Sequence, residues 1–318
     1  MVSGSAGETG AVFCPDDIES LESAVTTFRA LDYRHGGGAV RAALDVLSRW
    51  TGRLRDGSVP ERLRGRLCTA LADLHNLLGW TEFDVGRADP ARRHFDRAAE
   101  LAAEAGNDDL IANVCYRLGR LHLHHQEAGA ALAVFGRGQA AARRAGSPLA
   151  KAILFANQAW AYAVQADAGA ALAHLGRAAD EFAIAEPPPP PWAAFFDEND
   201  LAAMTGTVLA ELGRSANARY AAQAIPSLTA ATAGYGPEMA RSRSLTLILL
   251  ALSHALEHDL AESGRVVDEA IETARSVQSV RTKDRLEPIE AVVGVAESGR
   301  AGQALLERIE AFRAEPLS

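Results

Sequence analysis

The sequence predicts an all-α protein, a right-handed superhelix of antiparallel helix pairs that forms an α-solenoid. Three observations predict it. One pattern of small and bulky residues recurs at a spacing of 40 residues within positions 65–182. Alanine and leucine dominate the composition while aromatic residues make up only 6% of it, which favours helix over strand. Glycines and prolines separate segments that are each long enough for a helix of several turns.

The recurring pattern consists of a small residue, a turn residue, a small residue, a bulky residue and another small residue. Its first copy is Gly79, Gly86, Ala91, Phe95 and Ala98. The same offsets give a second copy at Gly119, Gln126, Ala131, Phe135 and Gly138, and a third at Ala159, Ala166, Ala171, Leu175 and Ala178. Such a unit cannot bury its apolar face alone, so it stacks on its neighbours. The pattern resembles the tetratricopeptide repeat, with helices longer than those of the usual 34-residue unit.

We expect one continuous array, because a solenoid grows by adding units. Residues 1–15, rich in glycine, serine and alanine, are expected to be disordered. A first helix is expected from Asp16 or Asp17 to Tyr33 and a second at about 39–55, separated by the glycines at 36–38. Within the array at 16–318, repeats are expected at 64–106, 107–146, 147–186, 194–233 and 238–277, followed by a C-terminal cap at 284–313.

Five consecutive prolines, Pro187–Pro191, interrupt the array between the third and fourth repeats. They cannot be helical, and we expect them to form a short polyproline II spacer. Trp192, Phe195 and Phe196 follow at once and are expected to anchor the spacer to the core. The alternative is a docking motif for a proline-recognition domain.

The charge and the cysteines limit the partners and the compartment. The net charge is −9 and no basic face is apparent, so direct nucleic-acid binding by this chain is not expected. The longest apolar run, Leu245–Leu252, is too short to span a bilayer. The three cysteines are far apart in sequence and are interpreted as reduced thiols, which predicts a cytoplasmic protein.

No catalytic residue, cofactor or metal site is predicted. His122, His124 and His125 lack the i, i+4 spacing and the HExxH pattern of helical zinc ligands. The chain also contains no GxSxG or Walker motif. An enzyme of a known motif type is therefore not expected, although an enzyme that uses the groove without a recognised motif stays an alternative.

The candidate site is a stripe of the first helices, which line the concave face of a helix-pair solenoid. One helix carries a wholly polar stripe, and tryptophans on the helices before and after it supply flat apolar surface. Arginine can hold a carboxylate or a phosphate, and asparagine can bond the N–H and C=O groups of an extended peptide. The candidate ligand-binding residues are Trp80, Asn113, Tyr116, Arg117, Arg120, His124, Asn157 and Trp160.

Two alternatives stay open at this point. Arg117 and Arg120 either bind a ligand or only form internal salt bridges, since acidic residues lie in the neighbouring stripes. Those acidic residues are Asp73, Asp84, Asp200 and Glu211. A wholly apolar stripe on a later helix is either ordinary core or part of a homodimer interface. It consists of Leu245, Leu249, Leu252 and Leu256.

A more specific resemblance runs from about Ile18 to Arg313. It is carried by the stretches FRALDYRHGGGAVRAAL, LHNLLGWTEFDVG, YRLGRLHLHH, RRAGSPLA and PPWAAFFDENDLAAMTG. Together they resemble the sensor half of bacterial helix-turn-helix regulators of the XRE type, which carry a C-terminal tetratricopeptide array. Only about 17 residues precede the first array helix, too few for a helix-turn-helix domain, so the DNA binding of the family is not carried over.

The resemblance implies a regulatory protein that dimerises and senses a ligand. We therefore expect a non-enzymatic tetratricopeptide protein that binds a peptide, a small molecule or a protein segment in its concave groove. The alternative is an adaptor that joins protein partners through its outer faces without a small ligand.

Overall fold

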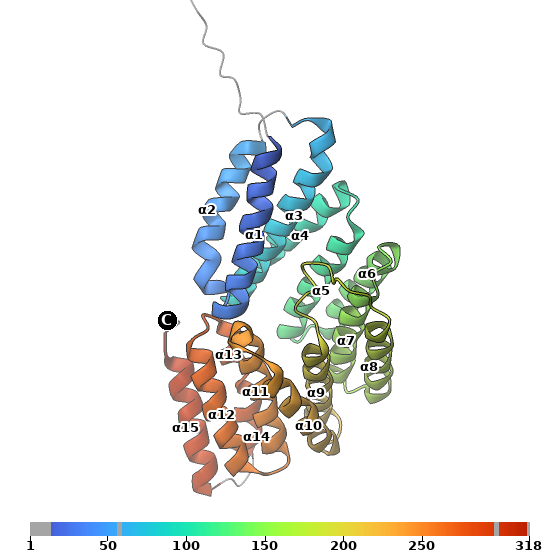
Figure 1. Ribbon diagram of the computed structural model, residues 1–318. Helices are drawn as coiled ribbons and strands as arrows, with labels where there is room; N and C mark the ends of the chain where they lie inside the picture. Colours follow the sequence, from blue (N-terminus) through green and yellow to red (C-terminus); the bar gives the residue numbers. More distant parts are fainter. Residues whose placement is uncertain (1–13, 56–58, 296–298, 317–318) are drawn as a thin grey trace, which may run out of the picture.

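The computed structural model describes residues 14–55, 59–295 and 299–316, and this part of the chain contains helices and no strand (Figure 1). Of the segment 1–15, which is expected to be disordered, residues 1–13 lie outside the described residues. The first helix begins at Pro15, before the expected start at Asp16 or Asp17. Within these residues no helix is long and apolar enough to cross a membrane.

The helices pack in antiparallel pairs, as the 40-residue pattern predicts. In chain order they are α1 (Pro15–His35), α2 (Gly37–Arg55), α3 (Glu61–Asp84), α4 (Ala88–Glu104), α5 (Asp108–His124), α6 (Ala128–Arg144), α7 (Pro148–Val164), α8 (Ala168–Ala183), α9 (Glu198–Ser215), α10 (Arg219–Gly234), the 3₁₀ helix η1 (Pro237–Met239), α11 (Ala240–Leu256), α12 (Leu260–Arg275), α13 (Val280–Asp284), α14 (Glu287–Val295) and α15 (Gly299–Ala314). The all-α prediction and the prediction of stacked helix pairs are confirmed.

The small residues of the pattern lie where two helices of a pair touch. Phe95 and Phe135 are completely buried. A Cβ atom added at Gly79 would lie 2.7 Å from Cδ1 of Phe95, and one added at Gly119 would lie 2.1 Å from Cε1 of Phe135. Ala131 is likewise completely buried. The bulky ring therefore occupies the space that the glycine leaves open, which draws the two backbones together.

The turn residue of the pattern ends the first helix of a pair in a left-handed conformation. Gly86 has a φ of 80°, and Gln126, Ala166 and His258 each have a φ of 61°. The left-handed conformation suits glycine best but is tolerated elsewhere when the turn requires it. The fourth pair differs, because the residue at the same offset from Gly206, which is Gly213, lies within α9, and this helix ends only at Ser215.

The glycines at 36–38 are more than a turn. Helix α1 ends at His35 and α2 begins at Gly37, so the break between them is shorter than the expected one between Tyr33 and residue 39. A Cβ atom at Gly37 would lie 2.8 Å from Cα of Thr81, and one at Gly38 would lie 2.8 Å from Cβ of Gln278. Three segments distant in sequence thus meet where these residues lack side chains.

The first and last parts of the array are in contact, so the solenoid closes on itself. The Gln278 N–H donates to the His35 carbonyl at 2.8 Å, and the Gly38 N–H donates to the Gln278 carbonyl at 3.1 Å. Figure 1 shows the lower ends of α1 and α2 meeting the region of α11 and α13. We call residues 277–285, which make this junction, the closure segment.

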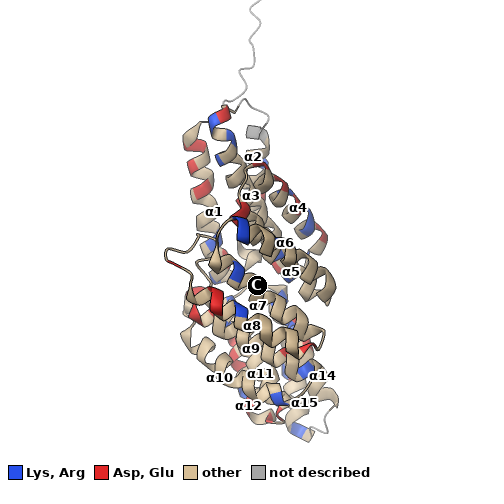
Figure 2. Ribbon diagram, turned by 90° about the vertical axis from the view of Figure 1, so that its right-hand side faces the viewer, with Lys and Arg blue, Asp and Glu red and all other residues tan. Residues whose placement is uncertain are grey.

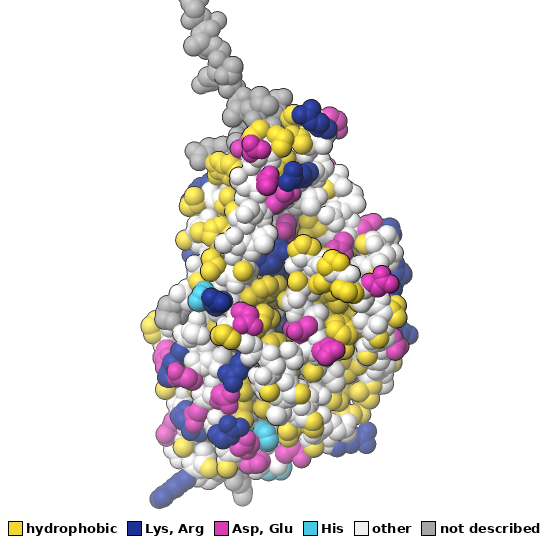
Figure 3. Space-filling view, in the orientation of Figure 1, with side chains coloured by type: hydrophobic (Ala, Val, Ile, Leu, Met, Phe, Trp, Pro, Cys, Tyr) yellow, Lys and Arg dark blue, Asp and Glu magenta, His cyan; other side chains and the backbone are white. Residues whose placement is uncertain are grey.

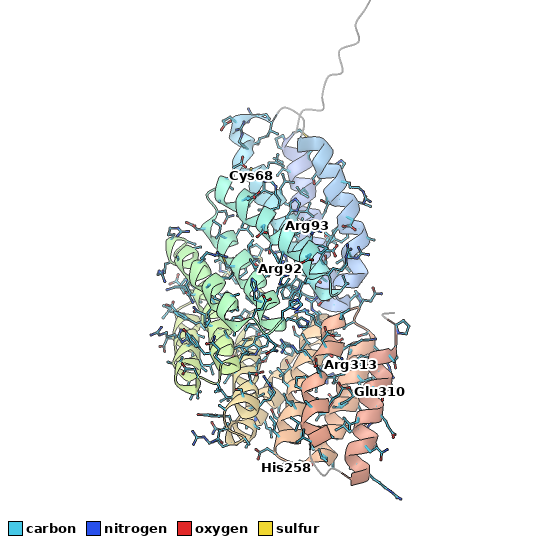
Figure 4. The ribbon with its side chains drawn as sticks, turned by 180° about the vertical axis from the view of Figure 1, so that it is seen from behind. Cys68, Arg92, Arg93, His258, Glu310 and Arg313 are labelled. Atoms are coloured by element: carbon cyan, nitrogen blue, oxygen red, sulfur yellow. The ribbon has the colours of Figure 1, made fainter. Side chains whose placement is uncertain are left out.

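The expected cap at 284–313 is formed by α14 and α15, which pack against α11 and α12. An ion pair between Arg313 and Glu290 joins the two cap helices. Figure 4 shows Arg313 and Glu310 on α15, and Arg92 and Arg93 on α4, in the view from behind. The short helix α13 before the cap was not predicted, and it belongs to the closure segment.

The residues after the proline run anchor it, as expected. Trp192 and Phe196 are buried, and the Trp192 indole N–H donates to Oδ2 of Asp109 at the start of α5. Phe195 reaches further inward, with its ring centroid 5.9 Å from that of Tyr116. The segment between α8 and α9 therefore brings an aromatic side chain to the interior.

Candidate functional site

The inner helices surround two adjacent cavities at the centre of the molecule. The first chamber, of about 90 Å³, lies among Arg120, Trp160, Asp200, Met204, Leu249 and Arg285. The second chamber, of about 80 Å³, lies among Tyr33, Trp80, Tyr116, Arg117, Phe195 and Arg281. Arg120, Asp200, Ser242 and Leu245 line both chambers. Figure 3 shows hydrophobic side chains gathered around the middle of the face seen in Figure 1.

Five of the eight predicted site residues line these chambers. They come from α3, α5 and α7, and they are Trp80, Tyr116, Arg117, Arg120 and Trp160. Asn157 lies beside the first chamber, where its Oδ1 accepts from Arg120 Nη1 at 3.3 Å and its amide donates to the Ile153 carbonyl at 2.7 Å.

Asn113 and His124 are predicted site residues that line neither chamber. Asn113 is completely buried, and its amide atoms have no hydrogen-bond partner in the described part of the chain. His124 lies at the C-terminal end of α5, where its Nε2 is 3.1 Å from Oδ2 of Asp284. His124 therefore contacts the closure segment instead of the chambers.

Aromatic rings form one wall of the second chamber. The rings of Trp80 and Tyr116 are stacked with centroids 6.3 Å apart, and those of Tyr116 and Phe195 are stacked at 5.9 Å. Tyr33 adds a fourth ring, 6.1 Å from Phe195. Helices α1, α3 and α5 and the segment before α9 each contribute one of these rings. The wall is therefore a product of the closed solenoid.

Guanidinium groups lie over the two tryptophans. Arg117 Cζ is 5.2 Å from the ring centroid of Trp80. Arg120 and Arg285 share Trp160, with Cζ atoms 4.7 and 4.4 Å from its centroid. At these distances the ring quadrupole attracts the cations, so each tryptophan fixes the position of the arginine above it.

Two other arginines of the chambers are neutralised by buried carboxylates. Arg241 Nη1 lies 2.8 Å from Asp32 Oδ1 and 3.2 Å from Asp84 Oδ2, and Arg281 Nε lies 2.7 Å from Asp84 Oδ1. The Gly37 N–H also donates to Asp84, at 2.7 Å. Burial by itself would raise the pKa of Asp84, but Arg241 and Arg281 outweigh burial and lower the pKa to about 2.

Arg117, Arg120 and Arg285 have no carboxylate within 4 Å among the described residues. The acidic residues that could have paired with Arg117 and Arg120 are engaged elsewhere: Asp73 by Arg29, Asp84 by Arg241 and Arg281, and Glu211 by Arg214. Burial lowers the pKa of Arg117. Burial and the nearby Arg120 lower the pKa of Arg285 to about 9. Asp73, Asp84 and Glu211 therefore form their ion pairs with other arginines and not with Arg117 or Arg120.

Asp200 brings a carboxyl group to both chambers without neutralising them. Burial and the neighbouring Asp197 raise the pKa of Asp200 to about 8, so this carboxyl keeps its proton at neutral pH. Burial also raises the pKa of Tyr235, which lines the first chamber beside it. The chambers therefore contain excess positive charge.

The apolar leucine stripe lies on the inside of the solenoid. Leu245 and Leu249 line the chambers and Leu252 is buried. Among the described residues, no group of three or more metal-binding side chains comes together. Cys68 and Cys115 are buried and free, as expected of cysteines packed within helices.

Sequence reasoning missed the chamber residues that come from the two ends of the array. Tyr33, Arg241, Arg281 and Arg285 line the chambers because α11 packs on α1 and the closure segment reaches α1 and α3. The sequence does contain a signal, since Arg281, Lys283 and Arg285 form a basic stretch before the cap. Nothing in that stretch indicates which distant helices it meets.

No model of a known protein family matches this chain, and no curated protein matches it. The likeness to the tetratricopeptide repeat therefore rests on the chain's own repeat pattern.

Proposed function

We propose that this protein is a non-enzymatic receptor that binds a negatively charged ligand inside its solenoid and has a regulatory role. The ligand is a peptide, a small molecule or a protein segment. The observation that carries the proposal is the set of three arginines, Arg117, Arg120 and Arg285, that lie at the chambers without a carboxylate partner within 4 Å in the described chain.

Arg117 is buried, and Arg120 and Arg285 are half-buried. Guanidinium groups that have lost part of their water without gaining a counter-ion are unfavourable, and an anion bound beside them lowers that penalty. Arginine binds carboxylate and phosphate through paired N–H groups, and such charge-assisted bonds are stronger than neutral ones. Aromatic walls with a few polar groups are typical of a ligand site. The same features would have little purpose in an adaptor that uses only its outer faces.

The tetratricopeptide kind of array, with a right-handed superhelix, is part of this proposal, as are a cytoplasmic location and a homodimeric state. We also propose that the chain does not bind nucleic acid directly, because its net charge is −9 and duplex affinity comes mainly from basic contacts. Figure 2 shows acidic and basic residues interspersed along the helices in that view.

The test begins with native mass spectrometry of the protein purified from its own host, to find a molecule that co-purifies. That molecule should raise the melting temperature of the parent, since a ligand at a hundredfold excess over its Kd stabilises by about 2.7 kcal/mol. The response should be largely lost in Arg120→Gln and in Arg285→Gln, because a lost charged hydrogen-bond partner costs about 1.5–3 kcal/mol.

Arg177→Gln is the matched control. Arg177 also lies over an aromatic ring, that of Phe155, and has no ion pair among the described residues, but it is exposed on the outer helix α8. This variant should respond to the ligand as the parent does. A ligand bound equally well by the Arg120 and Arg285 variants would show that the chambers are not its site.

A further inference from the structure

We infer that the ligand is a small aromatic anion, with a flat ring in the second chamber and a carboxylate or phosphate group held by Arg120 and Arg285. This inference rests on the proposed function and specifies the chemical class of its ligand.

The position of the anionic group follows from the free hydrogen-bonding capacity of the two arginines. Arg120 lines both chambers, and its only hydrogen bonds within the described chain come from Nη1, to Asn157 Oδ1 at 3.3 Å and to Met204 Sδ at 3.7 Å. The guanidinium group of Arg285 makes a cation–π contact but no hydrogen bond or ion pair with a described residue. Both side chains line the first chamber, so a single anion in that chamber can accept from both.

The nearest opposite charges do not fill this place. Glu211 and Asp284 act on Arg285 from beyond ion-pair distance, and they are bound to Arg214 and His124. The carboxyl group that faces both chambers, Asp200, is placed to donate a hydrogen bond when it carries its proton. An anion is therefore the group that completes the polar contacts of the first chamber.

The ring follows from the walls of the second chamber. Stacked and tilted rings line it, and aromatic pairs prefer such geometries to random contact. Trp80 is 7% exposed, and its indole N–H is buried without a hydrogen-bond partner in the described residues. Trp80, Tyr116 and Phe195 all line this chamber, so a planar ring that enters it meets aromatic side chains with which it can stack.

The small size follows from the volumes of the chambers. On the scale used for the chamber volumes, a space of about 10–15 Å³ holds one water molecule. Chambers of about 90 and 80 Å³ hold several waters or a molecule of similar bulk, but not an extended peptide. A peptide along the inner face would also have to displace the closure segment, which is held by Arg281 and by the Ser279 hydroxyl on Asp84 at 2.8 Å.

The test uses the full chain and five probes of defined chemistry. Phenyl phosphate and benzoate carry both a ring and a charge, inorganic phosphate carries only the charge, and benzyl alcohol carries only the ring. The fifth probe is an acetylated, amidated pentapeptide with one glutamate. Binding is followed by quenching of tryptophan fluorescence and by the melting temperature. We expect at least one ring-bearing anion to bind tenfold or more tightly than each of the other three probes.

Variants then separate the two halves of the site. Arg120→Gln should weaken the better ring-bearing anion by about tenfold to a hundredfold, whereas Arg177→Gln should leave its affinity unchanged. Phe195→Leu should weaken that anion but not inorganic phosphate. Circular dichroism checks that each variant is folded, and Arg120→Lys, which keeps the charge without the planar fork, replaces Arg120→Gln if the latter unfolds; we expect it to weaken binding as well.

The outcomes distinguish this inference from the proposed function. If the pentapeptide binds more tightly than both aromatic anions and loses affinity in Arg120→Gln, the proposed function stands and the inference is wrong. If inorganic phosphate binds as tightly as phenyl phosphate, the aromatic part is wrong. If no anionic probe binds at millimolar concentration, the inference is overturned. If a co-purified ligand binds Arg120→Gln and Arg285→Gln as tightly as the parent, the proposed function is overturned as well.

Discussion

At the scale of single residues, glycine and alanine decide how closely the two helices of a pair approach. Gly119 lies on α5 against the completely buried ring of Phe135 on α6. Alanine has a higher helix propensity than glycine, so by propensity alone it would stabilise the helix at this position. The ring leaves no room for it, because the added Cβ would lie 2.1 Å from Cε1. Packing outweighs propensity here.

We predict that Gly119→Ala lowers the free energy of unfolding by about 1–3 kcal/mol, the usual cost of overpacking a core. Gly136→Ala on the facing helix α6 is the control, since a Cβ there meets nothing within 4 Å. That change should stabilise the protein by about 0.5–1 kcal/mol, the helical preference for alanine over glycine. Urea unfolding followed by circular dichroism measures both. Equal effects of the two substitutions would contradict the assigned packing.

Asp200 gives the protein a characteristic pH dependence. Its pKa in the folded protein is raised to about 8 from an ordinary value of 3.8 by burial and Asp197. The folded state then binds more protons than the unfolded state between these two values, so stability falls as the pH rises through this range. Below about pH 4 both states carry the proton, and the unfavourable effect is absent.

We predict that Asp200→Asn removes this dependence, because asparagine keeps a neutral polar group without an ionisable proton. The variant should melt at a higher temperature than the parent at pH 9, and the difference should shrink steadily toward pH 4. Thermal unfolding across that range measures it. A difference between the two proteins that stays constant with pH would show that Asp200 titrates normally.

At the scale of elements, the closure segment is what turns a row of helix pairs into an enclosure. It places Gln278 between His35 and Gly38, and it carries Arg281 to Asp84. The glycines at 36–38 make this contact possible because a side chain at Gly38 would collide with Gln278. Removing one partner of a buried ion pair is strongly destabilising, so the segment stays in place once the pair has formed.

We predict that Gly38→Ala loosens the junction while the helix pairs stay folded. A Cβ at this position would lie 2.8 Å from Cβ of Gln278, and a relief of that contact moves the closure segment outward. Hydrogen exchange at the amide of Gln278 should become severalfold faster, since a local loss of about 1 kcal/mol changes the opening equilibrium about fivefold. Gly52→Ala in the same helix, where a Cβ meets nothing within 4 Å, is the control. Unchanged exchange at Gln278 would show that the segment tolerates the methyl group.

At the scale of the whole molecule, closure determines which surfaces remain for other proteins. The leucine stripe of α11 that suggested a dimer contact lies on the inside, with Leu245 and Leu249 at the chambers. A homodimer would therefore use another surface. Exposed apolar side chains include Leu172 on α8 and Ile184 directly after it, although single exposed apolar residues are common on protein surfaces.

We predict a homodimer, on the resemblance to dimeric regulators, that does not depend on the leucine stripe. Sedimentation velocity at tens of micromolar should show a dimer for the parent and for Leu249→Met, which conserves volume inside the chamber. A sedimentation coefficient of the monomer throughout that range would reject the dimer. A dimer lost only in Leu249→Met would return the interface to this stripe.

The sequence by itself determined the helix pairs, because their pattern is local: a residue and its partners recur within 40 positions. It also placed Trp80, Arg117, Arg120 and Trp160 on one face, since a stripe on one helix and its equivalents on adjacent repeats share a face, although Asn113 and His124 of the same stripe line neither chamber. Only the tertiary structure decided that the array closes and which arginine meets which carboxylate. Asp84 binds Arg281 from 197 positions away and Arg241 from 157, and ion pairs depend on distance in space, which no local pattern encodes. The charge left on Arg120 and Arg285 is therefore visible only in the folded molecule.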